Sequence, residues 1–201
     1  MFNKYEVYTT TASIYCYKNS NVLKNKAGIR DGNTLRAMEN EIVAIKQYQM
    51  ILSPITGKFT KNHLYRIHRF LFEDIYSFAG HTRKEQIAKG TTTFYPPASI
   101  DKELGKTFRF IADGHQLRDY TGSDLLDAIA FVMAELNVVH PFREGNGRAI
   151  REFIRLLALH NGLHIDWSNV EYTAILDASI ESVDDHTALI PILEQVITPQ
   201  N

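Results

Sequence analysis

With 201 residues, 44% of them apolar, the chain is expected to form one domain around a single core. Its formal net charge of −1 at pH 7 excludes the strongly basic composition of nucleic-acid-binding proteins. Cys16 is the only cysteine, which excludes an internal disulfide. No apolar run reaches the ~18 residues that span a bilayer. We therefore expect a cytoplasmic protein that binds neither nucleic acid directly nor a membrane.

Helical periodicity covers most of the chain. Apolar residues recur at three- and four-residue spacing, which predicts amphipathic helices over residues 34–52, 60–78, 101–112, 124–139, 148–160, 171–182 and 186–197. Ser53-Pro54 ends the first of these, because proline cannot continue a helix. The fourth is apolar on most sides, so we expect it to be buried.

Residues 80–97 break this pattern. Threonines and aromatic residues surround Gly90, and Pro96-Pro97 stops any helix. A short β-hairpin, or flap, is therefore predicted here.

No repeats or linker-like stretches interrupt the chain, and we expect residues 1–32 to be an N-terminal extension packed on a domain that spans residues 33–201. Within that extension, the basic residues of segment 15–31 are expected to form a solvated face rather than a binding patch, because Asp31, Glu39 and Glu41 dilute their field.

The run from His140 to Arg151, H-P-F-R-E-G-N-G-R-A-I-R, carries the chemistry. Gly145 and Gly147 can adopt backbone angles closed to other residues, so successive N–H groups can turn toward one anion. The helix that follows adds the positive end of its dipole. Arg148 and Arg151 are three residues apart and share a helix face, which suits successive phosphates of a nucleotide.

Glu144 and His140 complete the site in this run. A carboxylate beside an anion hole is repulsive unless a cation intervenes, and Mg²⁺ is typically held by one or two carboxylates plus substrate phosphates. His140 is the residue of the run that can take a proton near neutral pH. The run therefore predicts transfer of a nucleotide-derived group to an acceptor that His140 deprotonates.

The run matches the signature of the Fic family, H-P-F-x-[DE]-G-N-G-R-x-x-R, at every specified position. The segment F-A-G-H-T-R-K-E-Q-I-A-K-G-T-T-T-F-Y-P-P resembles the segment leading into the family's target-docking flap, and Y-C-Y-K-N-S-N-V-L-K-N-K-A-G-I resembles the N-terminal stretch of its compact bacterial members. The resemblance covers essentially the whole chain from Tyr15. It implies a mainly α, single Fic-type domain with a short β-hairpin flap over the active site.

This resemblance also implies a function, AMP transfer from ATP to a Tyr, Thr or Ser hydroxyl of another protein. By position, His140 would be the base, Glu144 would hold Mg²⁺, and Arg151 would pair with the γ-phosphate. The anion hole and the phosphate contact would come from Gly145, Asn146, Gly147 and Arg148. The target segment would add as a strand to the flap, at Gly90, Thr91, Thr92, Thr93, Phe94 and Tyr95.

Many family members are inhibited by a glutamate within [ST]-x-x-x-E-[GN] that pairs with the second arginine of the signature. Outside the signature, the only Glu followed by Gly or Asn is Glu39, and Leu35 stands four positions earlier where a hydroxyl is required. Thr34 lies five positions back, well off the Glu39 face of a helix. We therefore expect no built-in inhibitor. The resemblance suggests the toxin of a toxin–antitoxin pair, with a separate small antitoxin and a type II topoisomerase subunit as target. Glu39 as a degenerate internal inhibitor stays an alternative.

Two other functions are weighed against protein adenylylation. A protein kinase of the family's Doc branch would carry a lysine at Gly147, so that glycine argues against it. A non-catalytic nucleotide-binding adaptor would have no need of His140. Elsewhere, His63 and His68 lie off a shared helical face and are expected to be surface or packing residues rather than metal ligands.

Overall fold

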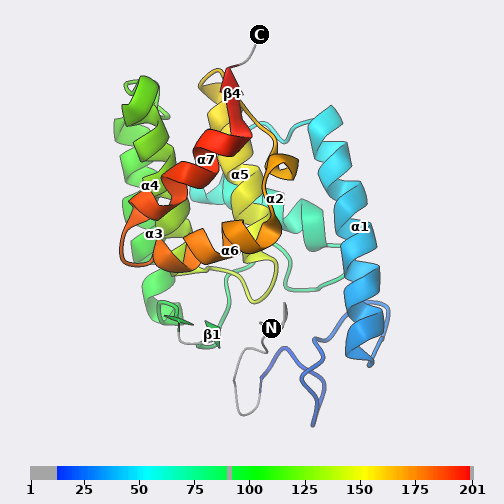
Figure 1. The fold of residues 1–201 in the computed structure, drawn as a ribbon. Helices are drawn as coiled ribbons and strands as arrows, with labels where there is room; N and C mark the ends of the chain where they lie inside the picture. Colours follow the sequence, from blue (N-terminus) through cyan, green and yellow to red (C-terminus); the bar gives the residue numbers. More distant parts are fainter. Residues whose placement is uncertain (1–12, 90–91, 200–201) are drawn as a thin grey trace.

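The computed structural model describes residues 13–89 and 92–199. Their α-helices are α1 (Gly32–Leu52), α2 (Lys61–Phe72), α3 (Ile100–Asp113), α4 (Gly122–Val139), α5 (Asn146–His160), α6 (Tyr172–Glu181) and α7 (Ile190–Val196). Two antiparallel sheets pair β1 (Ala88–Lys89) with β2 (Thr92–Thr93) and β3 (Leu163–Ile165) with β4 (Ile197–Pro199). Short 3-10 turns are η1 (Pro97–Ser99), η2 (Trp167–Asn169) and η3 (His186–Leu189). The expected mainly helical fold with a small hairpin is confirmed (Figure 1).

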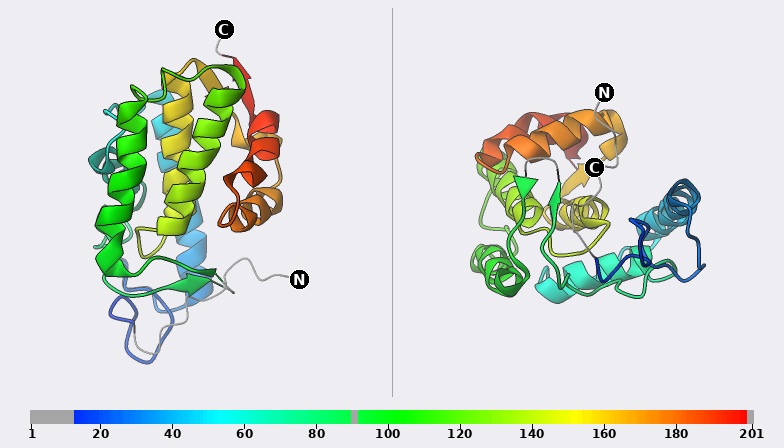
Figure 2. Two further views of the ribbon diagram at one scale, coloured as in Figure 1. Left: turned by 90° about the vertical axis from the view of Figure 1, so that its left-hand side faces the viewer. Right: turned by 90° about the horizontal axis from the view of Figure 1, so that it is seen from below.

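Helix α5 lies at the centre of the molecule. Seen from below, α1, α2, α3, α4 and α6 surround it (Figure 2). Six of its apolar side chains are fully buried, namely Ala149, Ile150, Phe153, Ile154, Leu157 and Ala158. Burying a large apolar side chain stabilises the fold by about 1.5–3 kcal/mol. The start of α5, where the signature run ends, is therefore anchored in the core.

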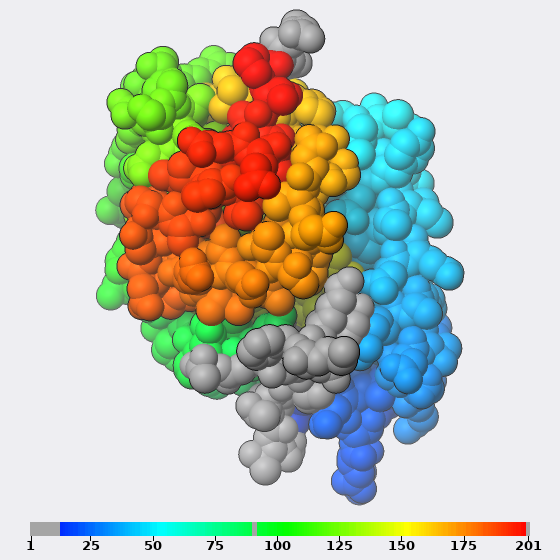
Figure 3. Space-filling view, in the orientation of Figure 1, coloured from blue at the N-terminus to red at the C-terminus, as the bar shows by residue number. Residues whose placement is uncertain are grey.

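The remaining helices form the flanks of this centre. In the space-filling view α1 lies on the right of the visible face and the C-terminal elements lie on its left (Figure 3). In the part of the chain that the structure describes, no helix is both long and apolar enough to cross a membrane.

Helix boundaries agree with the periodicity to within about two residues except at two places. The helix predicted to reach residue 78 ends at Phe72. The N–H groups of Ile75 and Tyr76 both donate to the Phe72 carbonyl, and the Ile75 carbonyl accepts from Lys26 in the N-terminal segment at 2.9 Å. The chain thus turns while Ile75 and Tyr76 stay buried, which is why their apolar spacing imitates a longer helix.

The last predicted helix is divided. Residues 186–197 form η3, then α7 with Pro191 in its first turn, and Ile197 already belongs to β4. The β3–β4 pair was not predicted, because strands of three residues are too short to show alternation. The N-terminal segment makes a tight turn closed by a bridge between Cys16 and Leu23.

Candidate active site

His140 is held in an unfavourable backbone conformation at the end of α4. Its φ of 46° and ψ of 62° lie in the left-handed region, which costs a non-glycine residue about 1–2 kcal/mol. Its N–H donates to Leu136 O at 3.0 Å, and Pro141 prevents α4 from continuing. Because local sequence does not favour this geometry, contacts from other elements must maintain it.

The imidazole of His140 has a defined tautomer. Nδ1 lies 3.2 Å from the Asn137 carbonyl oxygen, which only accepts, so Nδ1 carries the proton and Nε2 keeps its lone pair. Phe94 of the flap stacks on the ring at 3.8 Å between centroids and 15° between planes. Burial lowers the pKa of His140 to about 3, with smaller contributions from Lys89 and Arg83. The ring is therefore neutral at pH 7, with Nε2 as its basic atom.

The loop after His140 is closed by Asn146. Its Oδ1 accepts from Phe142 N at 2.8 Å and its Nδ2 donates to Phe142 O at 2.8 Å, and only 1% of the residue is exposed. Both polar side-chain atoms are thus engaged in holding the loop. A contribution of Asn146 to an anion hole would come from its backbone N–H at the start of α5.

The two signature glycines differ. Gly145 has φ 79°, as expected for a left-handed turn, and caps α5. Gly147 lies within the first turn of α5 and does not have a positive φ, so the expectation that it needs special backbone angles was wrong. A Cβ there would lie 3.2 Å from Arg151 Nη1, so the missing side chain leaves room for that guanidinium.

We expect Gly145→Ala to lower the free energy of unfolding by about 2–5 kcal/mol, from left-handed strain and overpacking. The added Cβ would lie 2.2 Å from Cζ of Phe72, which is fully buried. Gly162→Ala is the matched control, because Gly162 also has a positive φ, 77°, but its Cβ would meet nothing within 4 Å. Urea titration measures both, and equal losses would contradict the role of the Phe72 contact.

His68 of α2 supports the same loop. Gly80 N donates to His68 Nδ1 at 2.8 Å, so Nε2 carries the proton and donates to Glu144 O at 2.9 Å. The ring stacks on Phe142 at 3.7 Å, and burial lowers its pKa to about 3. The expected packing role is correct, but incomplete, because His68 also fixes the Glu144 backbone. Its place on the apolar stripe of α2 with Leu64 and Leu71 was a usable signal.

The two signature arginines face different neighbours. Arg148 Nη2 lies 2.5 Å from Glu39 Oε1 of α1 and 3.6 Å from Glu144 Oε1, with its guanidinium 4.8 Å from the Phe72 ring centroid. Arg151 instead lies 5.6 Å from the Tyr172 ring centroid at the start of α6. Their three-residue spacing predicted that both lie on one helix face. The structure adds that Arg148 reaches toward α1 and Arg151 toward α6.

Glu39 is the acidic partner of Arg148. Tyr76 donates its hydroxyl hydrogen to Glu39 Oε2, and only 8% of Glu39 is exposed. Burial and the Glu39 charge raise the pKa of the Tyr76 hydroxyl beyond its usual range. Glu39, Tyr76 and Arg148 thus form a buried network beside the signature loop.

Glu144 offers a carboxylate at this loop. Its Oε1 accepts from Gly145 N at 2.9 Å, and burial, followed by the nearby charge of Glu39, raises its pKa. A cation beside two such carboxylates is electrostatically favourable. Across residues 13–89 and 92–199, no group of three or more His, Cys, Asp or Glu side chains is arranged to hold a metal ion. A site with few protein carboxylates fits Mg²⁺, which takes further oxygen ligands from substrate phosphates.

The predicted hairpin is present beside His140. Ala88 pairs with Thr93 and Lys89 with Thr92, whereas Gly90 and Thr91 lie outside the described residues. Phe94 is buried against His140, and Tyr95 is exposed. The exposed side chains of Thr93 and Tyr95 therefore flank Phe94, the flap residue that contacts the base.

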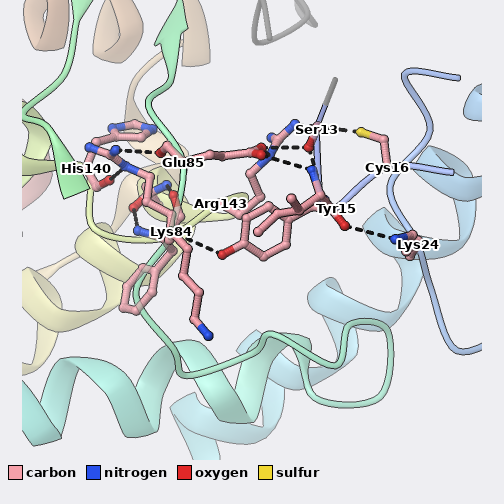
Figure 4. A network of polar contacts seen from close by, with 12 residues as sticks. Ser13, Tyr15, Cys16, Lys24, Lys84, Glu85, His140 and Arg143 are labelled. Carbon is pink, nitrogen blue, oxygen red and sulfur yellow. Dashed lines mark hydrogen bonds and ion pairs between the residues drawn. The ribbon is translucent and has the colours of Figure 1, made fainter. Parts of the chain in front are cut away.

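A polar network missed by the sequence analysis joins the N-terminal segment to this site (Figure 4). Glu85 accepts from Ser13 Oγ at 2.6 Å, from Ile14 N at 3.1 Å and from Arg143 Nε at 3.0 Å. Tyr15 accepts from Lys84 N through its hydroxyl oxygen at 2.9 Å. Arg143 occupies one of the three unspecified positions of the signature, so the pattern itself contained no signal for this contact.

Three comparisons with known proteins agree with one another. Residues 58–158 match the model of the Fic/DOC family. The chain is 36% identical over 179 residues to "Protein adenylyltransferase VbhT" of Bartonella schoenbuchensis, covering 89% of this chain but only 37% of that protein's length. It is 31% identical over 185 residues to "Probable protein adenylyltransferase Fic" of Escherichia coli K12, covering 92% of each. The N-terminal Fic domain of a putative cell filamentation protein from Bartonella quintana, with bound ADP, superposes with a TM-score of 0.86 at 29% identity, covering 93% of this chain and 95% of that one.

Proposed function

Because the chain belongs to the Fic/DOC family, we propose that it is a protein adenylyltransferase, which moves AMP from ATP to a Tyr, Thr or Ser hydroxyl of a target protein. The observation that carries this proposal is the neutral His140, whose Nδ1 lies against Asn137 O and whose ring stacks on Phe94 of the flap. Relatives named protein adenylyltransferases and a similar domain with bound ADP support it.

The proposed reaction begins with the target hydroxyl. His140 Nε2 takes the hydroxyl proton, and the hydroxyl oxygen attacks the α-phosphorus of ATP. A new oxygen–phosphorus bond forms, the bond from the α-phosphorus to the bridging oxygen breaks, and pyrophosphate leaves. The imidazolium formed from His140 is then stabilised by the surrounding phosphate charges.

The phosphates would be held by the start of α5. The backbone N–H groups of Gly145, Asn146 and Gly147 would contribute to the positive end of the α5 dipole, where anions are stabilised. Arg148 and Arg151 would bind the β- and γ-phosphates through charge-assisted hydrogen bonds. Arg148 would exchange part of its contact with Glu39 for phosphate.

We propose Mg²⁺ as the cofactor, held by Glu144 and the ATP phosphates. When bound, it neutralises phosphate charge and favours departure of pyrophosphate. Its expected ligand set matches one partly buried carboxylate, whose pKa is raised by burial and by the nearby charge of Glu39 although Arg148 lies 3.6 Å away.

The target is proposed to bind the flap in extended form. A strand added at Thr92 and Thr93 would bring a hydroxyl toward His140, with Phe94 and Tyr95 as neighbours. The proposed setting is a cytoplasmic toxin whose small antitoxin carries [ST]-x-x-x-E-[GN] and whose target is a type II topoisomerase subunit. Copurification of such an antitoxin, or labelling of that subunit, tests these finer points.

Labelled ATP distinguishes the proposed activity from its alternatives. Incubation with Mg²⁺ and lysate should label a protein from α-labelled ATP and not from γ-labelled ATP. Label from γ-labelled ATP alone would indicate a kinase, and nucleotide binding without label would indicate an adaptor. Mass spectrometry of the labelled band identifies the modified residue.

The acid limb of the rate should lie below the ordinary histidine range. A base works when neutral, so activity is lost as pH falls through its pKa, and burial moves the pKa of His140 from 6.5 to about 3. We expect kcat/KM to change little between pH 7.5 and 5.5, where an unshifted histidine would lose about tenfold. The measurement uses excess Mg²⁺, and an acid limb centred at 6.5 would contradict the lowered pKa.

A further inference from the structure

Arg83 lies at the base of the flap and is nearly fully buried, with 2% exposed. Its guanidinium donates to four backbone carbonyls. Nε binds His140 O at 2.9 Å, Nη1 binds Glu85 O at 2.9 Å, and Nη2 binds both Tyr95 O and Val139 O, the latter at 3.3 Å. Its own N–H donates to Pro141 O at 2.8 Å.

Two of these carbonyls belong to the end of α4. Val139 is the last residue of α4 and His140 is its C-cap. At this end of a helix, the unpaired carbonyls and the negative end of the dipole favour a cation. The planar guanidinium satisfies both with directed hydrogen bonds. Since the His140 backbone is strained, these bonds, together with that to Pro141, oppose its relaxation to a common conformation.

The other two carbonyls belong to the flap. Glu85 precedes β1 and Tyr95 follows β2, so one guanidinium spans both legs of the hairpin. Phe94, adjacent to Tyr95, stacks on the His140 ring. Gln86 Nε2 donates to Phe94 O at 2.7 Å, which further fixes this leg. Arg83 thus sets the separation between the flap and the end of α4.

We propose that Arg83 is a positioning residue for transfer, which holds His140 in its left-handed conformation and keeps the flap in register with it. A target segment on the flap and the base that deprotonates it then move as one body. This inference rests on the proposed adenylyl transfer, and it assigns to Arg83 no contact with ATP or target.

Arg83→Lys keeps the positive charge but cannot reach four carbonyls with one ammonium group. We expect kcat to fall about 10- to 100-fold, as a misplaced base predicts, while KM for ATP changes by less than about twofold. Arg118→Lys, at an exposed site, is the control and should match the wild type. An unchanged kcat, or a change confined to KM, would overturn the proposal.

Amide hydrogen exchange tests the same link without activity. Phe94 N donates to Ile87 O in the flap, and His140 N donates to Leu136 O in α4. Both amides should exchange faster in Arg83→Lys and stay unchanged in Arg118→Lys. Faster exchange at Phe94 alone would overturn the coupling. If the wild type transfers no AMP, the proposed function fails, yet this result still decides whether Arg83 positions His140.

Phe94→Leu provides a second variant should Arg83→Lys lose its cooperative unfolding transition. It removes the ring stacked on His140 but leaves the carbonyls that bind Arg83. A lower kcat with KM for ATP retained supports the coupling of flap and base. Wild-type kcat in this variant would contradict it.

Discussion

His140→Ala is expected to lower AMP transfer about 10²–10⁴-fold, the usual contribution of a general base. The neutral ring presents Nε2 as its basic atom, and alanine removes it. ATP binding should persist, because the phosphate contacts are assigned to the start of α5 and its arginines. Transfer is measured with α-labelled ATP, and ATP affinity by calorimetry.

Two further variants separate the chemistry of His140 from its backbone. His140→Gly adopts the left-handed conformation without strain, so it should be at least as stable as His140→Ala and still be inactive. His164→Ala, at an exposed position on β3, should retain wild-type transfer. Comparable transfer by His140→Ala and the wild type would refute the assigned base.

Most helices could be predicted because each of them buries one apolar stripe of its surface against the rest of the protein. Periodicity identifies such a stripe in α3 or α5 without knowledge of its neighbours. It fails where apolar spacing persists beyond the end of a helix, as at Ile75 and Tyr76 after α2, where the Ile75 carbonyl accepts from Lys26 of the N-terminal segment. It also fails for β3 and β4, whose pairing joins distant segments.

The signature run could be interpreted because its residues are adjacent in sequence and act through known chemistry. The contacts of Arg83, His68 and Glu85 could not, because their partners lie 57, 76 and 58 residues away at His140, Glu144 and Arg143. Arg83 and His68 bind backbone atoms, which every residue possesses. Such contacts leave no pattern of residue types, so they emerge only when the fold brings the segments together.

Glu39 shows how geometry sharpens a question that sequence spacing left open. The family's inhibitory glutamate pairs with the second signature arginine, here Arg151. Glu39 instead lies 2.5 Å from Arg148, the first one, and accepts from Tyr76. The buried Glu39 carboxylate can stabilise the fold through these two partners, or it can restrain transfer by holding Arg148. The two roles predict opposite effects of removing Glu39 on transfer.

Glu39→Ala is expected to lower the free energy of unfolding by about 3–5 kcal/mol, the usual cost of removing one partner of a buried ion pair. Among the described residues, Arg148 would keep Glu144, at 3.6 Å, as its ion-pair partner, and Tyr76 would lose its acceptor. Chemical denaturation measures the loss. Glu41→Ala, at an exposed position of the same helix, should change stability by less than about 0.5 kcal/mol.

Transfer by the folded fraction of Glu39→Ala decides between the two roles of Glu39. We expect it not to exceed wild-type transfer, because Arg148 loses the contact that orients its guanidinium beside the phosphate site. A several-fold rise would instead identify Glu39 as an internal restraint that competes with phosphate for Arg148. Glu39→Gln strengthens the test, since it keeps a hydrogen-bond acceptor for Tyr76 while removing the charge that attracts Arg148. A rise in both variants would locate the restraint in that charge, and restraint by a separate antitoxin would then no longer be required.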